Sequence, residues 1–164
     1  MFDKFGEMDS CKEINELAEN LFNEGDTESI KAMAKENGIP EDYVDLYLNG
    51  DIPYLCDAQT AAMGKLDIES KNLKMKGLML DWVEYIRGTC MEDDLIAHQV
   101  RKKGKTLKGC MAALLTYSFH NRISVDKEII KAAKITANRV DFGTPGMGEA
   151  KKLIREYYLG GARS

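Results

Sequence analysis

Apolar side chains in the first fifty residues recur at the spacing of amphipathic helices. The clearest set repeats every three or four positions and comprises Ile14, Leu17, Ala18, Leu21 and Phe22. Ser10 and Glu13 precede this set with the Ser-x-x-Glu spacing of a capping box, which favours a helix start because each side chain can bond a free backbone amide. Two further helices are expected, one stopping at Asn37-Gly38 and one beginning at Pro40.

The middle of the chain holds two longer helical patterns. One runs from Asn72 to Gly88 and places on one face Leu78, Met79, Trp82, Val83 and Ile86. Trp82 is expected to anchor the core, because a large apolar ring on such a face contributes much buried area. The other predicts a buried helix face made of Leu107, Cys110, Met111, Leu114 and Leu115.

The pattern beyond residue 120 is less regular. A helix is expected from Ser124, with Ile129, Ile130 and Ala133 facing inward, and residues 140–142 are compatible with an extended segment. The last helix begins at Met147 or Gly148, and its apolar stripe comprises Ala150, Leu153, Ile154, Tyr157 and Tyr158. The patterns together predict an all-α fold, a compact multi-helix protein of about eight helices.

Charge divides the chain into regions of opposite sign. Residues 1–60 carry four basic and fifteen acidic side chains, a net charge of −11, whereas residues 61–94 carry −2 and residues 95–164 carry +9. The overall charge of −4 therefore conceals a dipolar molecule. We expect two subdomains: an acidic one of three to four helices at residues 1–64, and a basic helical one at residues 65–164 with a glycine-rich turn before its last helix.

The sequence offers few candidates for catalysis. His98 and His120 are the only histidines, and neither has a zinc-like spacing with cysteine. There is no phosphate-binding loop or nucleophile elbow, the four cysteines are scattered, and no apolar run reaches membrane-spanning length. We expect a non-catalytic cytoplasmic protein with reduced thiols, without a metal or cofactor and without a membrane partner.

A glycine-rich turn near the C-terminus has the chemistry of a phosphate contact. Residues 144–154 resemble the second half of a helix-hairpin-helix DNA-binding element, in which glycines such as Gly146 and Gly148 let a phosphate approach free helix amides. Glu149 would repel a phosphate there, so a packed helix start is the alternative interpretation. The candidate nucleic-acid-binding residues are Arg101, Lys102, Lys103, Lys105, Lys108, Gly146, Gly148, Lys151, Lys152 and Arg155.

Most of the chain also resembles a family of small proteins encoded on phages and conjugative elements. The likeness is carried by residues 17–22, 81–86, 108–115 and 146–161. Some proteins of this type are thought to be anti-CRISPR factors that block a type II RNA-guided nuclease. The resemblance implies a setting of conflict between a host and a mobile element.

Two functions are compatible with these features. The first is a non-catalytic inhibitor that binds a CRISPR effector nuclease, with the basic region on DNA or guide RNA and protein-facing residues Glu13, Glu16, Glu41, Asp42 and Asp45. The alternative is a helix-hairpin-helix-like DNA-binding accessory protein of a mobile element. A third arrangement, in which the acidic and basic ends pair with each other, would leave neither end for a partner.

Overall fold

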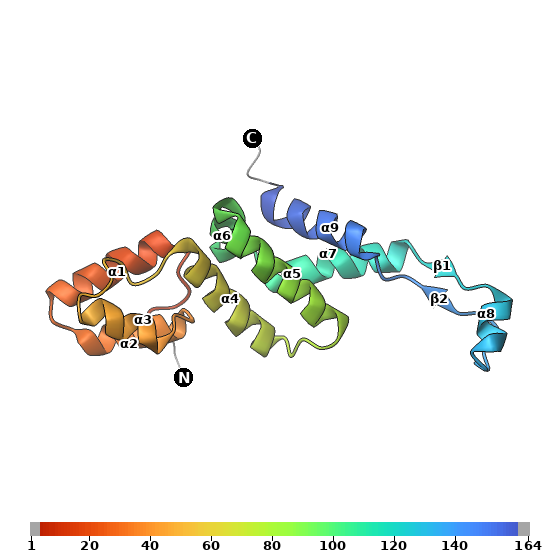
Figure 1. The fold of residues 1–164 in the computed structure, drawn as a ribbon, viewed down its shortest axis with the longest axis horizontal. Coiled ribbons are helices and arrows are strands. Elements are labelled where there is room, and N and C mark those ends of the chain that lie inside the picture. The colour runs from red at the N-terminus through yellow and green to blue at the C-terminus, as the bar shows by residue number, and fades with distance from the viewer. Residues whose placement is uncertain (1–3, 161–164) are drawn as a thin grey trace.

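The computed structural model describes residues 4–160, which form nine helices and one pair of short strands (Figure 1). Their bounds are α1 (Cys11–Asn23), α2 (Thr27–Glu36), α3 (Glu41–Leu48), α4 (Ala58–Asn72), α5 (Leu78–Glu92), α6 (Asp94–Arg101), α7 (Leu107–His120), β1 (Ile123–Ser124), α8 (Lys127–Ala132), β2 (Asp141–Phe142) and α9 (Met147–Leu159). The predicted all-α class is confirmed. Residues 1–3 and 161–164 of the two expected subdomains lie outside the described part of the chain.

Elements α1 to α8 follow one another along the long axis of the molecule, and the chain then returns so that α9 lies beside α7 (Figure 1). Figure 1 shows α1, α2 and α3 at one end, α4 to α7 and α9 in the centre, and an arm made of β1, α8 and β2 at the other end. The strands of this arm are antiparallel, with Ile123 opposite Phe142 and Ser124 opposite Asp141. The acidic helices and the arm are therefore far apart.

The helix starts are fixed by side-chain caps close to the predicted positions. The Ser10 hydroxyl accepts from the Glu13 amide at 3.1 Å, and the Asp26 carboxylate accepts from the Ser29 amide at 3.0 Å. The Glu13 carboxylate completes the first cap by accepting from the amide of Asp9 at 2.7 Å, one residue before the amide of an ordinary capping box. Pro40 lies at the N-cap of α3, one position before the predicted one.

Two hydrophobic clusters share α4. The first joins α1, α2 and α3 and includes Ala61 of α4, while the second joins α4, α5, α6, α7 and α9 and includes Ala62 and Leu66 of the same helix. Trp82 belongs to the second cluster and is 6% exposed, which confirms its predicted place in the core. The expected boundary between residues 64 and 65 falls inside this continuous helix.

Three sequence expectations for the C-terminal half are wrong. The helix expected from Ser124 starts at Lys127, because Ser124 pairs in the strand ladder and Asp126 caps the helix. Within and beside this short helix Ile130 is buried, but Ile129 is 60% exposed and Ala133 is also exposed. Leu115 of α7 is 70% exposed and lines an open hollow that it shares with Leu78 and Met79 of α5.

The side chain of Arg101, at the end of α6, joins the two clusters. It is 2% exposed. Its Nε donates to the Met8 carbonyl at 2.9 Å, and its Nη1 donates to the carbonyls of Asn37 and Ala61, both at 3.0 Å. Nη2 donates to the side-chain oxygen of Asn37. Four of its five N–H donors can thus bond oxygens from three separate segments.

The turn after α2 packs directly on the backbone of α4. A Cβ on Gly64 would lie 2.7 Å from the carbonyl oxygens of both Asn37 and Gly38, closer than real Cβ atoms approach. Gly38 also has a φ of +74°, a left-handed conformation that glycine adopts without strain. Next to this contact the ammonium of Lys65 donates to the Lys105 carbonyl at 3.0 Å and forms an ion pair with Glu7 at 3.1 Å.

Replacing Arg101 should destabilise the whole protein. We expect Arg101→Ala to lower the free energy of unfolding by about 3 kcal/mol, because it leaves buried oxygens without donors. Lys102→Ala removes a neighbouring exposed cation and should change stability by about 0.5 kcal/mol at most. Urea unfolding followed by circular dichroism measures both. Equal stabilities for the two variants would contradict the role assigned to Arg101.

Two mid-helix glycines should respond in opposite directions to alanine. Gly64→Ala should cost about 2 kcal/mol of unfolding free energy, because the added methyl group meets the backbone of the α2–α3 turn. Gly88→Ala in α5 meets nothing within 4 Å and should stabilise the protein by about 0.5 to 1 kcal/mol. Thermal unfolding of the two variants tests whether the α2–α3 turn lies against Gly64. A destabilised Gly88→Ala variant together with a neutral Gly64→Ala variant would refute this contact.

Candidate interaction surfaces

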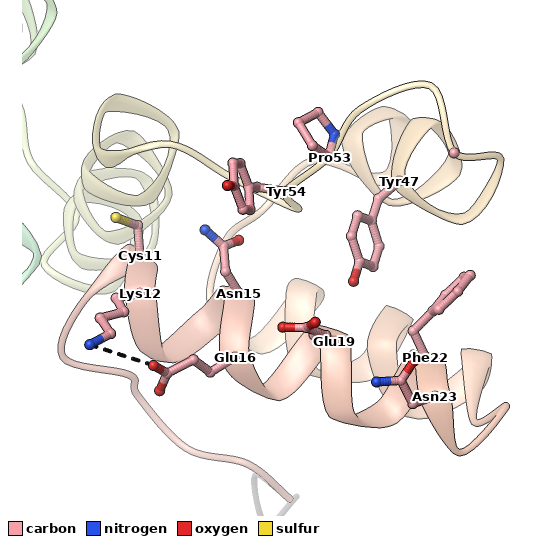
Figure 2. A pocket seen from close by; sticks show the side chains of 11 residues that line it. Cys11, Lys12, Asn15, Glu16, Glu19, Phe22, Asn23, Tyr47, Pro53 and Tyr54 are labelled. Carbon is pink, nitrogen blue, oxygen red and sulfur yellow. Dashed lines mark ion pairs between the residues drawn. The ribbon is translucent and has the colours of Figure 1, made fainter.

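A groove of about 570 Å³ lies in the acidic end, between α1 and the chain from α3 to α4 (Figure 2). One side of it consists of α1, with Glu16, Glu19 and Phe22, and the other side consists of Tyr47 on α3 and the following Pro53-Tyr54. Aromatic rings and carboxylates therefore line the same hollow. Tyr54 is 68% exposed and can contact a partner without prior rearrangement.

Both walls of the groove are held in place. The Asn15 side chain bonds the backbone of Cys56 twice: its Nδ2 donates to the Cys56 carbonyl at 2.8 Å, and its Oδ1 accepts from the Cys56 amide at 3.0 Å. This pair fastens the segment after α3 onto α1. At the other end of the groove, the rings of Phe22 and Tyr47 meet edge to face, with centroids 5.7 Å apart.

The two carboxylates in the groove have different surroundings. Glu16 is paired with Lys12 one helical turn earlier, at 3.6 Å between Nζ and Oε1. No ion pair to Glu19 forms within residues 4–160, and Figure 2 shows the Tyr47 hydroxyl directed toward its carboxylate. Burial, together with the negative charge of Glu19, raises the pKa of Tyr47. The groove thus contains an anionic group beside an aromatic hydroxyl that stays protonated.

The five acidic residues predicted to face a protein partner are all exposed, but they do not form one site. Glu13 and Glu16 are on α1, and only Glu16 lines the groove of Figure 2. Glu41 lies in a separate hollow between α2, α3 and α4, and Asp42 and Asp45 are exposed on α3. The sequence analysis missed Glu19, Phe22, Tyr47 and Tyr54, because nothing in their spacing indicated that α1 and the segment after α3 meet.

The predicted nucleic-acid-binding role of Arg101 is wrong. Its guanidinium is buried and bonded to Met8, Asn37 and Ala61, so no phosphate can reach it without opening the junction. Lys105 is also engaged: its ammonium donates to the Tyr157 carbonyl at 2.7 Å and lies 5.3 Å from the centre of the Tyr157 ring. Both cations serve the fold.

The remaining predicted cations are exposed on two sides of α9. Lys102, Lys103 and Lys108 lie near its C-terminal end, where the Tyr157 hydroxyl accepts from the Thr106 amide at 2.9 Å. Lys151 is near its N-terminal end, over the Tyr85 ring at 5.3 Å. Lys152 and Arg155 are exposed between these groups, and the Arg155 guanidinium is 3.9 Å from the Asp93 carboxylate. They are spread along a helix about 20 Å long.

The glycine-rich turn begins α9 but does not form a helix-hairpin-helix element. That element needs a helix on each side of the turn, and the segment before Gly146 contains strand β2 instead. Gly146 and Gly148 are exposed, with nothing within 4 Å of the position of an added Cβ. Pro145 is buried and Ala150 packs in the second cluster, so the turn does start a packed helix, as the alternative interpretation expected.

The opposite charges of the two ends do not cancel across an internal contact. Within residues 4–160, no ion pair joins an acidic side chain of residues 1–60 to a Lys or Arg of residues 95–164. The hydrogen bonds between these two regions in the described part of the chain are those of the Arg101 guanidinium to Met8 and Asn37, and that of the Lys103 backbone amide to the Asp9 carboxylate at 2.8 Å. Both charged surfaces remain open to solvent.

The arm at the far end combines the positive charge expected for residues 95–164 with exposed apolar side chains, which the sequence did not predict. Its exposed cations are Arg122, Lys127, Lys131, Lys134 and Arg139. Its most exposed apolar residues are Ile123, Ile129, Ile135 and Phe142, each more than half exposed. Only Asp141 on the arm pairs with one of these cations, Arg139, at 2.9 Å.

Other chemistry is sparse in the part of the chain that the structure describes. There, no three His, Cys, Asp or Glu side chains are grouped so that they could hold a metal ion. None of the described helices is long and apolar enough to cross a membrane. The four cysteines are unpaired between residues 4 and 160, and Cys11 alone among them is partly exposed, at the edge of the groove.

Comparisons of the chain with models of protein families, with curated proteins and with solved structures find no match. The surfaces of the chain itself are therefore the basis for proposing a function.

The cysteines should differ sharply in reactivity. Burial raises the pKa of Cys56, Cys90 and Cys110 to about 12, so at pH 8 only about one in ten thousand of each is the reactive thiolate. Cys11 has a raised pKa for the same reason but is partly exposed. With Ellman's reagent at pH 8 we expect Cys11 to react first in the native protein and all four to react in urea. Cys11→Ser should abolish the first phase, and its persistence in that variant would contradict the assignment.

Proposed function

We propose that this chain is a non-catalytic inhibitor of a type II RNA-guided nuclease, acting in the cytoplasm. In this proposal the acidic helices α1 to α3 bind the protein, and the basic surfaces of the C-terminal half contact its guide RNA or target DNA. The observation that carries the proposal is the charge separation, in which both ends are exposed and no ion pair joins them within residues 4–160.

An RNA-guided nuclease offers a suitable surface for each end. It holds the guide–target duplex in a strongly positive channel, and a surface with many exposed carboxylates is attracted to such a channel before any close contact forms. The exposed acidic residues Glu13, Glu16, Glu41, Asp42 and Asp45 supply this charge on two adjoining helices, α1 and α3. The choice of this target comes from the sequence resemblance to small proteins of phages and conjugative elements, to which the comparisons with known proteins add nothing.

The basic half suits contact with the phosphate backbone. The exposed lysines of this half are Lys102 and Lys103 after α6, Lys108 on α7, and Lys151 and Lys152 on α9. Lysines spread over a surface in this way favour phosphates of any sequence. No side chain among them is arranged to recognise a particular base. The expected contribution is added affinity for a nuclease that already carries nucleic acid.

A second candidate is an accessory protein of a mobile element that binds DNA by itself. It is favoured by the cationic arm, which would take over the role first assigned to the helix-hairpin-helix-like turn. This function requires binding to DNA without any nuclease, and that binding should weaken steeply as salt rises.

Cleavage assays with a panel of guide-loaded type II nucleases test the first function. We expect the protein to suppress cleavage by at least one of them at a near-equal molar ratio. The double variant Asp42→Lys/Asp45→Lys should raise the half-inhibitory concentration about tenfold, because it places positive charge against a positive channel. The matched control Asp81→Lys/Glu92→Lys changes the net charge equally on α5 and should inhibit like the wild type.

Full cleavage by every nuclease, with the protein present in clear molar excess over the nuclease, would overturn the inhibitor proposal. If the same preparation shifts bare DNA in a gel at low salt and no longer shifts it at high salt, the accessory function replaces the inhibitor proposal. Equal inhibition by the two double variants would show that α3 does not face the nuclease.

A further inference from the structure

The groove between α1 and the segment after α3 combines features that recognise one type of side chain. Its exposed surface is mostly apolar, supplied by Phe22, Tyr47, Pro53 and Tyr54, and Glu19 places a carboxylate among them. A planar cation on an apolar stem can stack on the rings and bond the carboxylate at the same time. That description fits the guanidinium of arginine.

We propose that this groove binds an arginine side chain presented by a basic segment of a partner protein. The inference deepens the proposed function and rests on it, since it assigns to the acidic end a defined site and to its partner a defined residue. The guanidinium lies against Tyr47 or Tyr54 and donates to Glu19, while its aliphatic stem contacts Pro53. A basic partner is chosen because its positive charge complements the carboxylate of Glu19 and the net negative charge of residues 1–60.

The immediate surroundings leave the carboxylate of Glu19 available. Lys12, the basic residue that lines the groove, is paired with Glu16 at 3.6 Å, and within residues 4–160 no ion pair reaches Glu19. The walls are already fixed by the Asn15–Cys56 hydrogen bonds and the Phe22–Tyr47 ring contact. Binding therefore needs little reorganisation, and a fixed site loses less entropy on binding than a mobile one.

The same groups disfavour the other classes of partner. A nucleic acid would bring its phosphates toward Glu16 and Glu19 in a region of net charge −11, which repels them. A purely apolar segment would desolvate the carboxylate of Glu19 without a compensating bond. Lysine satisfies the charge but has no planar group to stack on the tyrosines, so it should bind less tightly than arginine.

A titration without any nuclease tests the site. The probe is the blocked peptide Gly-Arg-Gly-Arg-Gly, added to isotope-labelled full-length protein and followed by two-dimensional NMR. We expect saturable shifts in the signals of Glu19, Tyr47 and Tyr54. The same peptide with lysine should bind about threefold more weakly, and the peptide with uncharged citrulline should cause no saturable shift.

Variants separate the groove from the general acidity of this end. Glu19→Gln and Tyr54→Ala should each weaken binding of the arginine peptide about fivefold. The control Glu24→Gln removes one exposed charge just beyond α1 and outside the groove, and it should bind within twofold of the wild type. Folding of each variant is checked by its NMR spectrum before the titration.

Three results would overturn the proposal. One is the absence of saturable shifts with the wild type, and another is equal weakening by Glu19→Gln and Glu24→Gln. The third is a concentration-dependent dimer, seen by sedimentation, that no longer forms in Glu19→Gln, because a second copy of the chain would then fill the groove. Because the peptide titration contains no nuclease, its outcome can be interpreted even if the protein fails to inhibit cleavage.

Discussion

The buried guanidinium of Arg101 is the constraint on which the arrangement of this protein depends. Removing a charge from water is costly, and here the cost is offset by four bonds to oxygens, from Met8, Asn37 and Ala61. These partners come from three segments that otherwise belong largely to the N-terminal cluster, while Arg101 itself ends α6 in the second one. Together with the close contact of Gly38 and Gly64, the bonds make one body of two cores.

Much of the fold could be predicted from local sequence rules, and the predictions that failed did so for a physical reason. The spacing of apolar residues predicted α1 well, because that helix buries a single stripe against a single core. By contrast, α4 gave weak periodicity since it divides its buried residues between two clusters and therefore carries no single stripe. Leu115 and Ile129 have core-like spacing yet are exposed, because spacing indicates a shared face and not whether another element covers it.

The candidate sites were predictable only in their general charge. Arg101 stands next to Lys102 and Lys103 and reads as part of a basic run, whereas its burial depends on residues up to 93 positions away in the chain. The groove likewise depends on Asn15 meeting Cys56, 41 positions later, a contact that no local pattern encodes. The one available signal was composition: Phe22, Tyr47 and Tyr54 are aromatic residues within the most acidic part of the sequence.

A rigid junction also changes what two weak surfaces can achieve. Exposed ion pairs and single cation–ring contacts contribute only about 0.5 to 1 kcal/mol each, too little for a stable complex alone. When two such surfaces are joined at a fixed distance, binding of the first raises the effective concentration of the second, and affinity can rise 10²- to 10⁴-fold without a new contact. This gain requires that both sites be reached at once. The bonds of Arg101 hold the acidic helices on the body that carries α9, so the proposed contacts of the acidic groove and of the lysines around α9 would be presented to one partner in a single orientation.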